Sequence, residues 1–513
     1  MERLIQYIKH TFGHKLSFWR IDNLKSKLIE YGPTFLIILI IVELLEHVGL
    51  PMLFYYLGNS VSDFFYVLVP APLVFCLHFI TAPLTFFIYI KFFKKKKKRK
   101  TPLSNFYKNI FKLFASISIA QCIPIIITPI LTQYFTPEDF GLYGLYISIC
   151  SIFGVIAGGK YDVAIMLPKR KSDSLNILTL SFLITFIFSS LCFSILNIFS
   201  DVFFDLTQSN LFKDYYFIIP ISIFLISINQ SIIVWLNRNK QYNNIATQNL
   251  IKSGSNSGSA LFFGIKSMNT GLVLGHVISL ISTSIFNTLH LLKDFEVQLI
   301  NKKSMKRNFK KYIDFLKFSS ISNLFNACSN IGMTALIVVF FGTKIAGLYF
   351  LAEKLVAIPL SFITSSVSQV YFEKASKLFH SDKIALLNLT NQIQKNIFYL
   401  LFPFLVICSL FGKELFSILG NEWAEAGVIL KYFTVFILVK NIYSPISHIG
   451  DILNKQKLLL FFNISLFVFQ LSSFYFLKEY NDIKVALLTA SIFGAIHYML
   501  LNIYMKNELR KKA

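Results

Sequence analysis

Four polar residues in one long apolar run could form a binding face, with Lys440 as the cation for an anion and Asp451 as a gating or ion-pairing acid. Lys440 lies deep in this run, and Ser444, His448 and Asp451 follow it at i+4, i+8 and i+11. On a helix, this spacing puts all four on one face. The functional interpretation is a cation that receives an anionic ligand. The alternative is a lysine that pairs with an acid or extends its side chain to the membrane boundary.

A second stripe consists of a hydroxyl and three amides at i, i+4, i+7 and i+11: Ser319, Asn323, Asn326 and Asn330. Lys317 lies just before it, near the expected inner end of the helix. Amides suit sugar hydroxyls, but they also hold membrane helices together, and the spacing leaves both interpretations open. Gln121, in an earlier apolar run, is a candidate of the same kind.

Other charged residues fall inside or at the ends of apolar runs. Glu353 and Lys354 are adjacent and therefore on different faces, so at most one can point straight into a central cavity. Lys160 and Asp162 end a helix at the expected inner boundary, where they could gate access or form an interfacial ion pair. Lys252 lies in a Ser- and Gly-rich run that could offer a binding surface or close helix packing.

A polar cluster near the N-terminus combines Glu43, Glu46 and His47, at i, i+3 and i+4, with His78 in the next apolar run. It could form a proton relay or a metal pair, or it could simply lock two helices together. No further ligands are evident, so we expect no metal site and no cofactor. No paired carboxylates or nucleophile triad are visible either, and we expect no enzyme activity.

The composition of the chain indicates that these residues lie in a membrane protein. Of the 513 residues, 55% are hydrophobic and 15% are charged, whereas soluble domains average about 25% charged residues. We predict an all-α integral membrane protein, with helices near the length that crosses ~30 Å of hydrocarbon. The fourteen expected helices cover residues 33–57, 64–90, 111–133, 141–158, 174–197, 215–236, 245–265, 271–290, 313–341, 347–371, 396–411, 427–450, 458–477 and 485–504.

The cations give the orientation. With the N-terminus inside, the cytoplasmic segments hold 38 of the 50 Lys and Arg residues, as the positive-inside rule requires. Both termini are then cytoplasmic, and the net charge of +24 needs no nucleic-acid partner. The basic run Lys94–Lys100 adjoins a membrane helix, so anionic lipid headgroups are its expected neighbour.

Recurring segments divide the chain. FKLFASIS at Phe111 returns as FLKFSSIS at Phe315, FGLYGLY at Phe140 returns as AGLYFLA at Ala346, and LNRNK is echoed by LNKQK. We therefore predict two parallel six-helix repeats that form two lobes around a central cationic cavity. The expected parts are an N-terminal extension with a two-helix hairpin (1–100), a first lobe (101–292), a basic cytoplasmic connector (293–311) and a second lobe (312–513).

Two blocks resemble Wzx-type polysaccharide flippases of the multidrug/oligosaccharidyl-lipid/polysaccharide (MOP) exporter superfamily. FTPEDFGLYGLYISICSIFGVIAGGKYDVAIMLPKRKSDSLNILTLS, from Phe135, resembles their first-half signature. FGKELFSILGNEWAEAGVILKYFTVFILVKNIYSPISHIGDILNKQK, from Phe411, resembles their second-half signature. The resemblance covers about residues 105–505, and residues 1–100 match no recognised pattern. The residues that carry the second signature are Gly420, Trp423, Ala426, Gly427, Ser444, Pro445 and Gln456.

The resemblance implies a flippase that moves a polyprenyl-diphosphate-linked oligosaccharide across the bacterial plasma (inner) membrane, for lipopolysaccharide O-antigen, capsule or exopolysaccharide. A polysaccharide polymerase or another assembly protein is then an expected partner. One alternative is another exporter of the superfamily, for a lipid intermediate or a drug. A membrane polymerase or acyltransferase is a further alternative, but the longest outer loops, near 198–214 and 412–426, are short for an active site.

The orientation can be tested by cysteine labelling in intact cells. A cysteine at Lys303 should resist an impermeant maleimide, because the basic connector is expected inside. A cysteine at Asn421 should react. The reverse pattern would contradict the topology.

Overall fold

The computed structural model describes residues 120–201, 216–357, 382–444, 455–480 and 482–511, with single residues between 358 and 381. The chain divides into two units, 1–108 and 109–513, and every described residue belongs to the second. The helices expected at 33–57 and 64–90 lie outside the described residues. So does the polar cluster of Glu43, Glu46, His47 and His78.

The first half contains five long helices. α8, α10, α13, α14 and α15 all begin and end within four residues of the predicted bounds. α8 begins where Thr136 and Asp139 form a capping box, with Pro137 in the first turn. The helices are Ala120–Leu131, α8 (Pro137–Ile156), α9 (Tyr161–Ala164), α10 (Lys171–Ile198), α13 (Ile218–Arg238), α14 (Tyr242–Ile265) and α15 (Gly271–Asp294).

The connector consists of η3 (Val297–Leu299) and α16 (Lys302–Lys311). The second half begins directly after it with a π-helical segment. Its elements are η4 (Phe315–Ser319), α17 (Ser320–Ile331), α18 (Met333–Phe341), α19 (Thr343–Ala352), η5 (Glu353–Ala357), α21 (Lys383–Leu410), α22 (Gly412–Ser417), η6 (Asn421–Trp423), α23 (Ala424–Tyr443), α25 (Gln456–Leu477), η8 (Lys478–Tyr480) and α26 (Ile483–Lys511).

Three helices of the second half differ from expectation. The helix predicted at 485–504 is α26, which continues to Lys511. The helix predicted at 313–341 is bent by 57° between α17 and α18, at Gly332, a residue that weakens a helix interior. The helix predicted at 396–411 is α21, which begins at Lys383 because the Asp382 side chain accepts a hydrogen bond from the Ala385 N–H. The first turns of α21 are polar, so a hydropathy profile does not show where this helix begins.

Eight helices within the described ranges are long and apolar enough to cross a membrane, and the bent pair makes a ninth. α14 has sufficient length but not the required hydropathy, because Ser, Asn and Gly residues interrupt its apolar positions. No strand occurs in the part of the chain that the structure describes. The chain is therefore an all-helical, multi-pass membrane protein.

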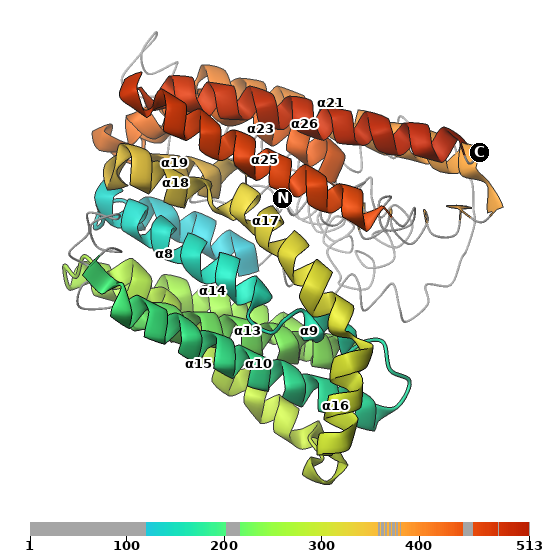
Figure 1. Ribbon diagram of the computed structural model, residues 1–513. Coiled ribbons are helices and arrows are strands. Elements are labelled where there is room, and N and C mark those ends of the chain that lie inside the picture. The colour runs from blue at the N-terminus through green and yellow to red at the C-terminus, as the bar shows by residue number, and fades with distance from the viewer. Residues whose placement is uncertain are drawn as a thin grey trace, which may run out of the picture. The chain divides into compact units, whose positions relative to one another are not determined.

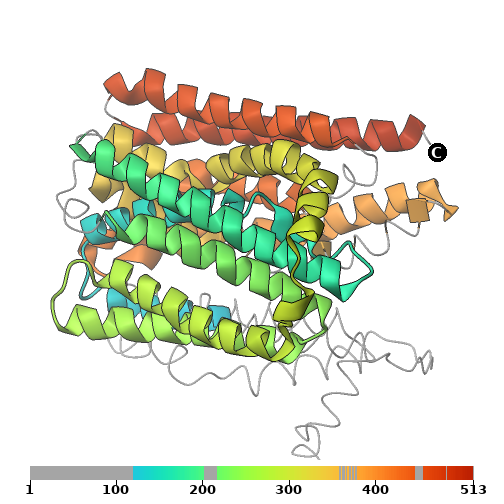
Figure 2. The same cartoon turned by 60° about the horizontal axis from the view of Figure 1, so that its bottom comes forward.

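Helix α8 joins the two halves. It packs on α13 in its own half, and on α17, α18 and α19 in the other. Figure 1 shows α8 in teal between the green helices of the first half and the yellow α18 and α19. The remaining helices pack mainly within their own half, α14 on α15 and α23 on α26, and the long α14 and α15 are also visible side by side in Figure 2.

The contact between α8 and α19 depends on two glycines. A Cβ added to Gly141 would lie 1.9 Å from the Thr343 carbonyl oxygen, and one added to Gly347 would lie 1.7 Å from the Pro137 oxygen. The two backbones therefore touch, as small residues permit where membrane helices cross. Both glycines belong to the recurring Gly-Leu-Tyr segment, at equivalent places in the two halves.

Trp423 reinforces this junction. Its side chain is fully buried, its Nε1 donates a hydrogen bond to the Thr132 carbonyl at 3.2 Å, and its ring packs edge-on against Phe140 at 5.1 Å. Gly420 adopts a φ of +132°, which favours glycine, and it places the tryptophan in this position. A loop of the second half thereby holds the first half at the end that the topology prediction places outside.

Replacing Gly347 by alanine should destabilise the protein, because the new methyl group would overlap a backbone oxygen. Such overpacking typically costs about 1–3 kcal/mol. Gly258→Ala is the matched control, since a Cβ at that helical position meets nothing within 4 Å. Thermal unfolding of both purified variants in one detergent should show a lower Tm only for Gly347→Ala. Equal Tm values would mean that the two helices separate without cost.

Candidate functional site

A cavity of about 450 Å³ opens among α19, η5 and α23. Lys440, Glu353 and Ser444 line it, so three of the residues predicted from the sequence come together here. The described residues of its wall all come from the second half. The others are Tyr349, Ala357, Thr364, Ser368, Phe433, Phe436, Ile437 and Asn441.

Helix periodicity explains how both walls are built. On α23 the lining positions are 433, 436, 437, 440, 441 and 444, the pattern of a single helix face. Opposite them, Tyr349, Glu353 and Ala357 repeat at i+4. The last two lie in η5, a π-helix, whose wider turn keeps residues four or five apart on one side. The cavity thus separates two facing stripes from different helices.

Lys440 and Glu353 give the cavity its electrostatic character. Opposite charges in one cavity attract each other, but the charged atoms of Lys440 and Glu353 are more than 4.0 Å apart and form no contact ion pair. The Lys440 ammonium also lies 5.6 Å from the centre of the Phe436 ring, within the range of a cation–π interaction. The cation is therefore compensated by an acid and a ring, with space between the charges.

Asn441 fixes one side of the cavity. Its Nδ2 donates to the Ile437 carbonyl at 2.8 Å, and its Oδ1 accepts from the Thr364 hydroxyl at 3.1 Å. This amide therefore ties α23 to the segment that follows η5. Asn441 was not among the predicted site residues, because it is adjacent to Lys440 and lies off the i+4 stripe that Lys440 begins.

The other two candidate lysines point elsewhere. The Lys354 ammonium lies 5.7 Å from the centre of the Phe140 ring, on α8 of the other half. Lys317 is exposed on η4 at the start of the second half. Neither lines the cavity that contains Lys440.

The amides of α17 mainly make hydrogen bonds within their own helix. The Asn323 amide donates to the Ser319 carbonyl at 2.8 Å, and the Asn330 amide donates to the Asn326 carbonyl at 2.8 Å. Tyr498 of α26 adds a longer bond of 3.5 Å to the Asn330 side chain. Asn326 is exposed and the other two amides are partly buried. Gln121, in the first described helix, is also partly buried.

Lys160 and Asp162 form a buried ion pair of 3.9 Å where α9 begins. Lys160 adopts a left-handed backbone conformation, with φ of +56°, at the N-cap of this short helix. An ion pair of these two residues was one of the two interpretations, and its location at the inner boundary stays a prediction. His448 and Asp451 lie outside the described residues.

A buried polar network in the first half was missed by sequence analysis. The Tyr146 hydroxyl lies 2.6 Å from Ser222 Oγ and 3.1 Å from His276 Nδ1, so it links α8, α13 and α15. These residues lie on three separate helices, and no local pattern could have connected them. Among the described residues, no group of three His, Cys, Asp or Glu side chains could hold a metal ion.

Comparison with known proteins shows the family to which the chain belongs. The family model described as "Polysaccharide biosynthesis protein" matches residues 130–428, more than half of the chain. The chain belongs to this family. No curated protein matches it in sequence.

Solved structures show which fold the family member adopts. The chain is similar to the lipid II flippase MurJ in an inward closed conformation, with a TM-score of 0.61 and 15% identity, covering 77% of this chain and 89% of that one. An inward-facing MATE family transporter of the MOP superfamily gives 0.55 and 13%, covering 80% and 96%. A MOP transporter from Pyrococcus furiosus, described as having a binding pocket of reversed polarity, gives 0.52 and 14%, covering 79% and 96%. The fold is that of MOP-superfamily transporters.

The pairing of Lys440 with Glu353 can be tested by a double-mutant cycle. Glu353→Gln and Lys440→Met should each lower the Tm, because each leaves one charge uncompensated inside the membrane. The double variant should be more stable than the sum of the single losses predicts, with a coupling of about 0.5–3 kcal/mol. Strictly additive losses, measured in one detergent, would show that the two charges act independently.

Proposed function

We propose that the protein translocates a lipid-linked oligosaccharide, carried on a polyprenyl diphosphate, across the bacterial plasma membrane for cell-surface polysaccharide biosynthesis. The observation that carries this proposal is a lysine facing a cavity within the membrane, in a chain that belongs to a polysaccharide biosynthesis family. We infer that the two predicted halves of this MOP-like fold move relative to each other and so alternate access to the cavity. No covalent chemistry is needed.

The energetics favour an anionic cargo. A charge at the bilayer centre costs from about 3 to over 10 kcal/mol, so Lys440 needs a compensating group. Glu353 is such a group in the described structure, but it does not contact the ammonium. A diphosphate could approach the Lys440 ammonium at close range, where low dielectric strengthens their attraction.

Glu353 also limits how tightly an anion can be held. A carboxylate in the same cavity repels a diphosphate, and this repulsion favours release on the far side. A transporter needs such moderation, since a cargo that binds too strongly is not released. The facing walls formed by η5 and α23 therefore combine a repulsive charge, Glu353, with an attractive one, Lys440.

Substitutions of Lys440 test the proposal. Lys440→Ala should lower the flipping rate of lipid-linked oligosaccharide in reconstituted vesicles by about tenfold to a hundredfold. A loss of this size corresponds to one charge-assisted hydrogen bond, which contributes about 1.5–3 kcal/mol. Lys440→Glu should abolish flipping, and Lys440→Arg should keep part of the rate because its charge is retained.

The matched control is Lys431→Ala, which removes a lysine from the same helix. Lys431 is exposed and does not line the cavity, so the variant should flip at the wild-type rate. If Lys440→Ala inserts normally and also flips at the wild-type rate, the lysine is structural and the proposal is wrong. Transport of cationic drugs but not of lipid-linked oligosaccharide would support the alternative exporter.

A further inference from the structure

The connector helix α16 carries a cationic face. Lys303, Lys306 and Lys310 follow one another at i, i+3 and i+7 and are all exposed, and no acidic residue occurs in the helix. The opposite side, with Met305, Asn308 and Phe309, packs on the protein. The apolar side of α16 is thus used by the fold, and the lysine face points away from it.

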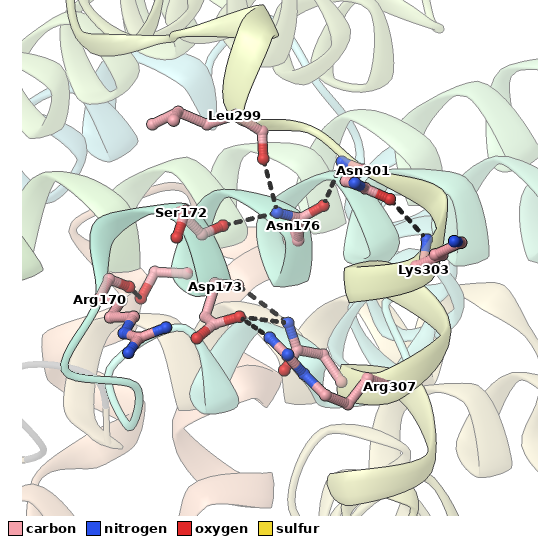
Figure 3. A network of polar contacts seen from close by, with 10 residues as sticks. Arg170, Ser172, Asp173, Asn176, Leu299, Asn301, Lys303 and Arg307 are labelled. Atoms are coloured by element: carbon pink, nitrogen blue, oxygen red, sulfur yellow. Dashed lines mark hydrogen bonds and ion pairs between the residues drawn. The ribbon is translucent and has the colours of Figure 1, made fainter.

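Side-chain bonds hold α16 firmly on the first half (Figure 3). Arg307 forms an ion pair of 2.6 Å with Asp173 at the start of α10. Asn176 donates to the Leu299 carbonyl at 2.9 Å, and its side-chain oxygen accepts from the Asn301 N–H at 2.9 Å. These bonds fix the direction in which the lysine face points.

Two further contacts complete the attachment. Glu296 pairs with Lys171 at 2.7 Å, and Tyr161 donates to the Phe309 carbonyl at 2.9 Å while stacking on its ring at 5.8 Å. The connector's acid Glu296 and the nearby Asp173 are therefore already engaged by other cations. Within the described ranges, Lys303, Lys306 and Lys310 form no ion pair. Their charges remain available for an external anion.

The position of α16 suggests the source of that anion. Figure 1 shows α16 running across the ends of the long helices, at the end of the bundle where the C-terminus lies. Because membrane-spanning helices end at the headgroup layer, we expect α16 at that level, where each nearby Lys or Arg can gain about a fivefold preference for anionic lipid. We propose that Lys303, Lys306 and Lys310 form a docking site for the headgroups of anionic phospholipids in the adjoining leaflet.

The site has a structural consequence. α16 is pinned to α10 on one side and continues through Tyr312 and Asp314 into η4, the first segment of the second half. A lipid bound to the lysine face therefore stabilises the one described segment that connects the two halves in sequence. This inference does not depend on which cargo the protein carries.

The test measures the Tm of the purified full-length protein in detergent. Short-chain dioctanoyl phosphatidylglycerol should raise the Tm in a saturable manner, because a ligand that binds the folded state stabilises it. Dioctanoyl phosphatidylcholine and inorganic phosphate at the same concentrations should not. The triple variant K303Q/K306Q/K310Q should need about tenfold or more phosphatidylglycerol for the same rise, whereas the triple arginine variant should respond like the wild type.

The matched control is K266Q/K413Q/K478Q, which removes three exposed lysines that follow the C-terminal ends of α14, α21 and α25: Lys266 directly after α14, Lys413 in α22 and Lys478 in η8. It should keep the wild-type response. Three results would overturn the proposal: equal loss in both glutamine variants, no loss in K303Q/K306Q/K310Q, or an equal rise with inorganic phosphate. None of these results bears on Lys440, so the proposed transport function is tested separately.

Discussion

The backbone contact between α8 and α19 is the constraint on which the rest of the structure depends. Gly141 and Gly347 allow two helices from different halves to touch, and no residue with a side chain could occupy either place without separating them. Beside Gly141, Phe140 packs edge-on against Trp423 of the second half, which adds a second contact between the halves. Because membrane helices gain little from hydrophobic burial against lipid, such close packing is what joins the halves.

Local physics made much of the fold predictable. Apolar runs of helix length located α8, α10, α13 and α15, although the prediction began α8 at 141 and so missed the capping box of Thr136 and Asp139. The bend at Gly332 and the early start of α21 at Lys383 were missed. The first depends on how two helix segments pack, and the second lies in polar turns that resemble a loop in a hydropathy profile.

The candidate site was only half predictable. Helix periodicity placed Lys440 and Ser444 on one face, and the cavity contains both. It could not place Glu353 opposite them, because that meeting depends on how α19 packs against α23. Periodicity also could not predict where the Lys354 side chain points, since its partner Phe140 lies more than two hundred residues away in the other half. Spacing within a helix fixes which residues share a face, and tertiary packing decides what that face meets.

Helix α19 links the junction to the cavity. Gly347 touches α8, Tyr349 packs on Phe433 of α23 at 4.8 Å, and Glu353 follows one turn later in the cavity wall. α19 therefore carries the contact between the halves, and η5, which continues it directly, carries the acid that faces Lys440. If α19 moves as a unit when the halves separate at α8, the distance between Glu353 and Lys440 changes too. Opening the junction and altering the attraction for an anion are then consequences of a single movement.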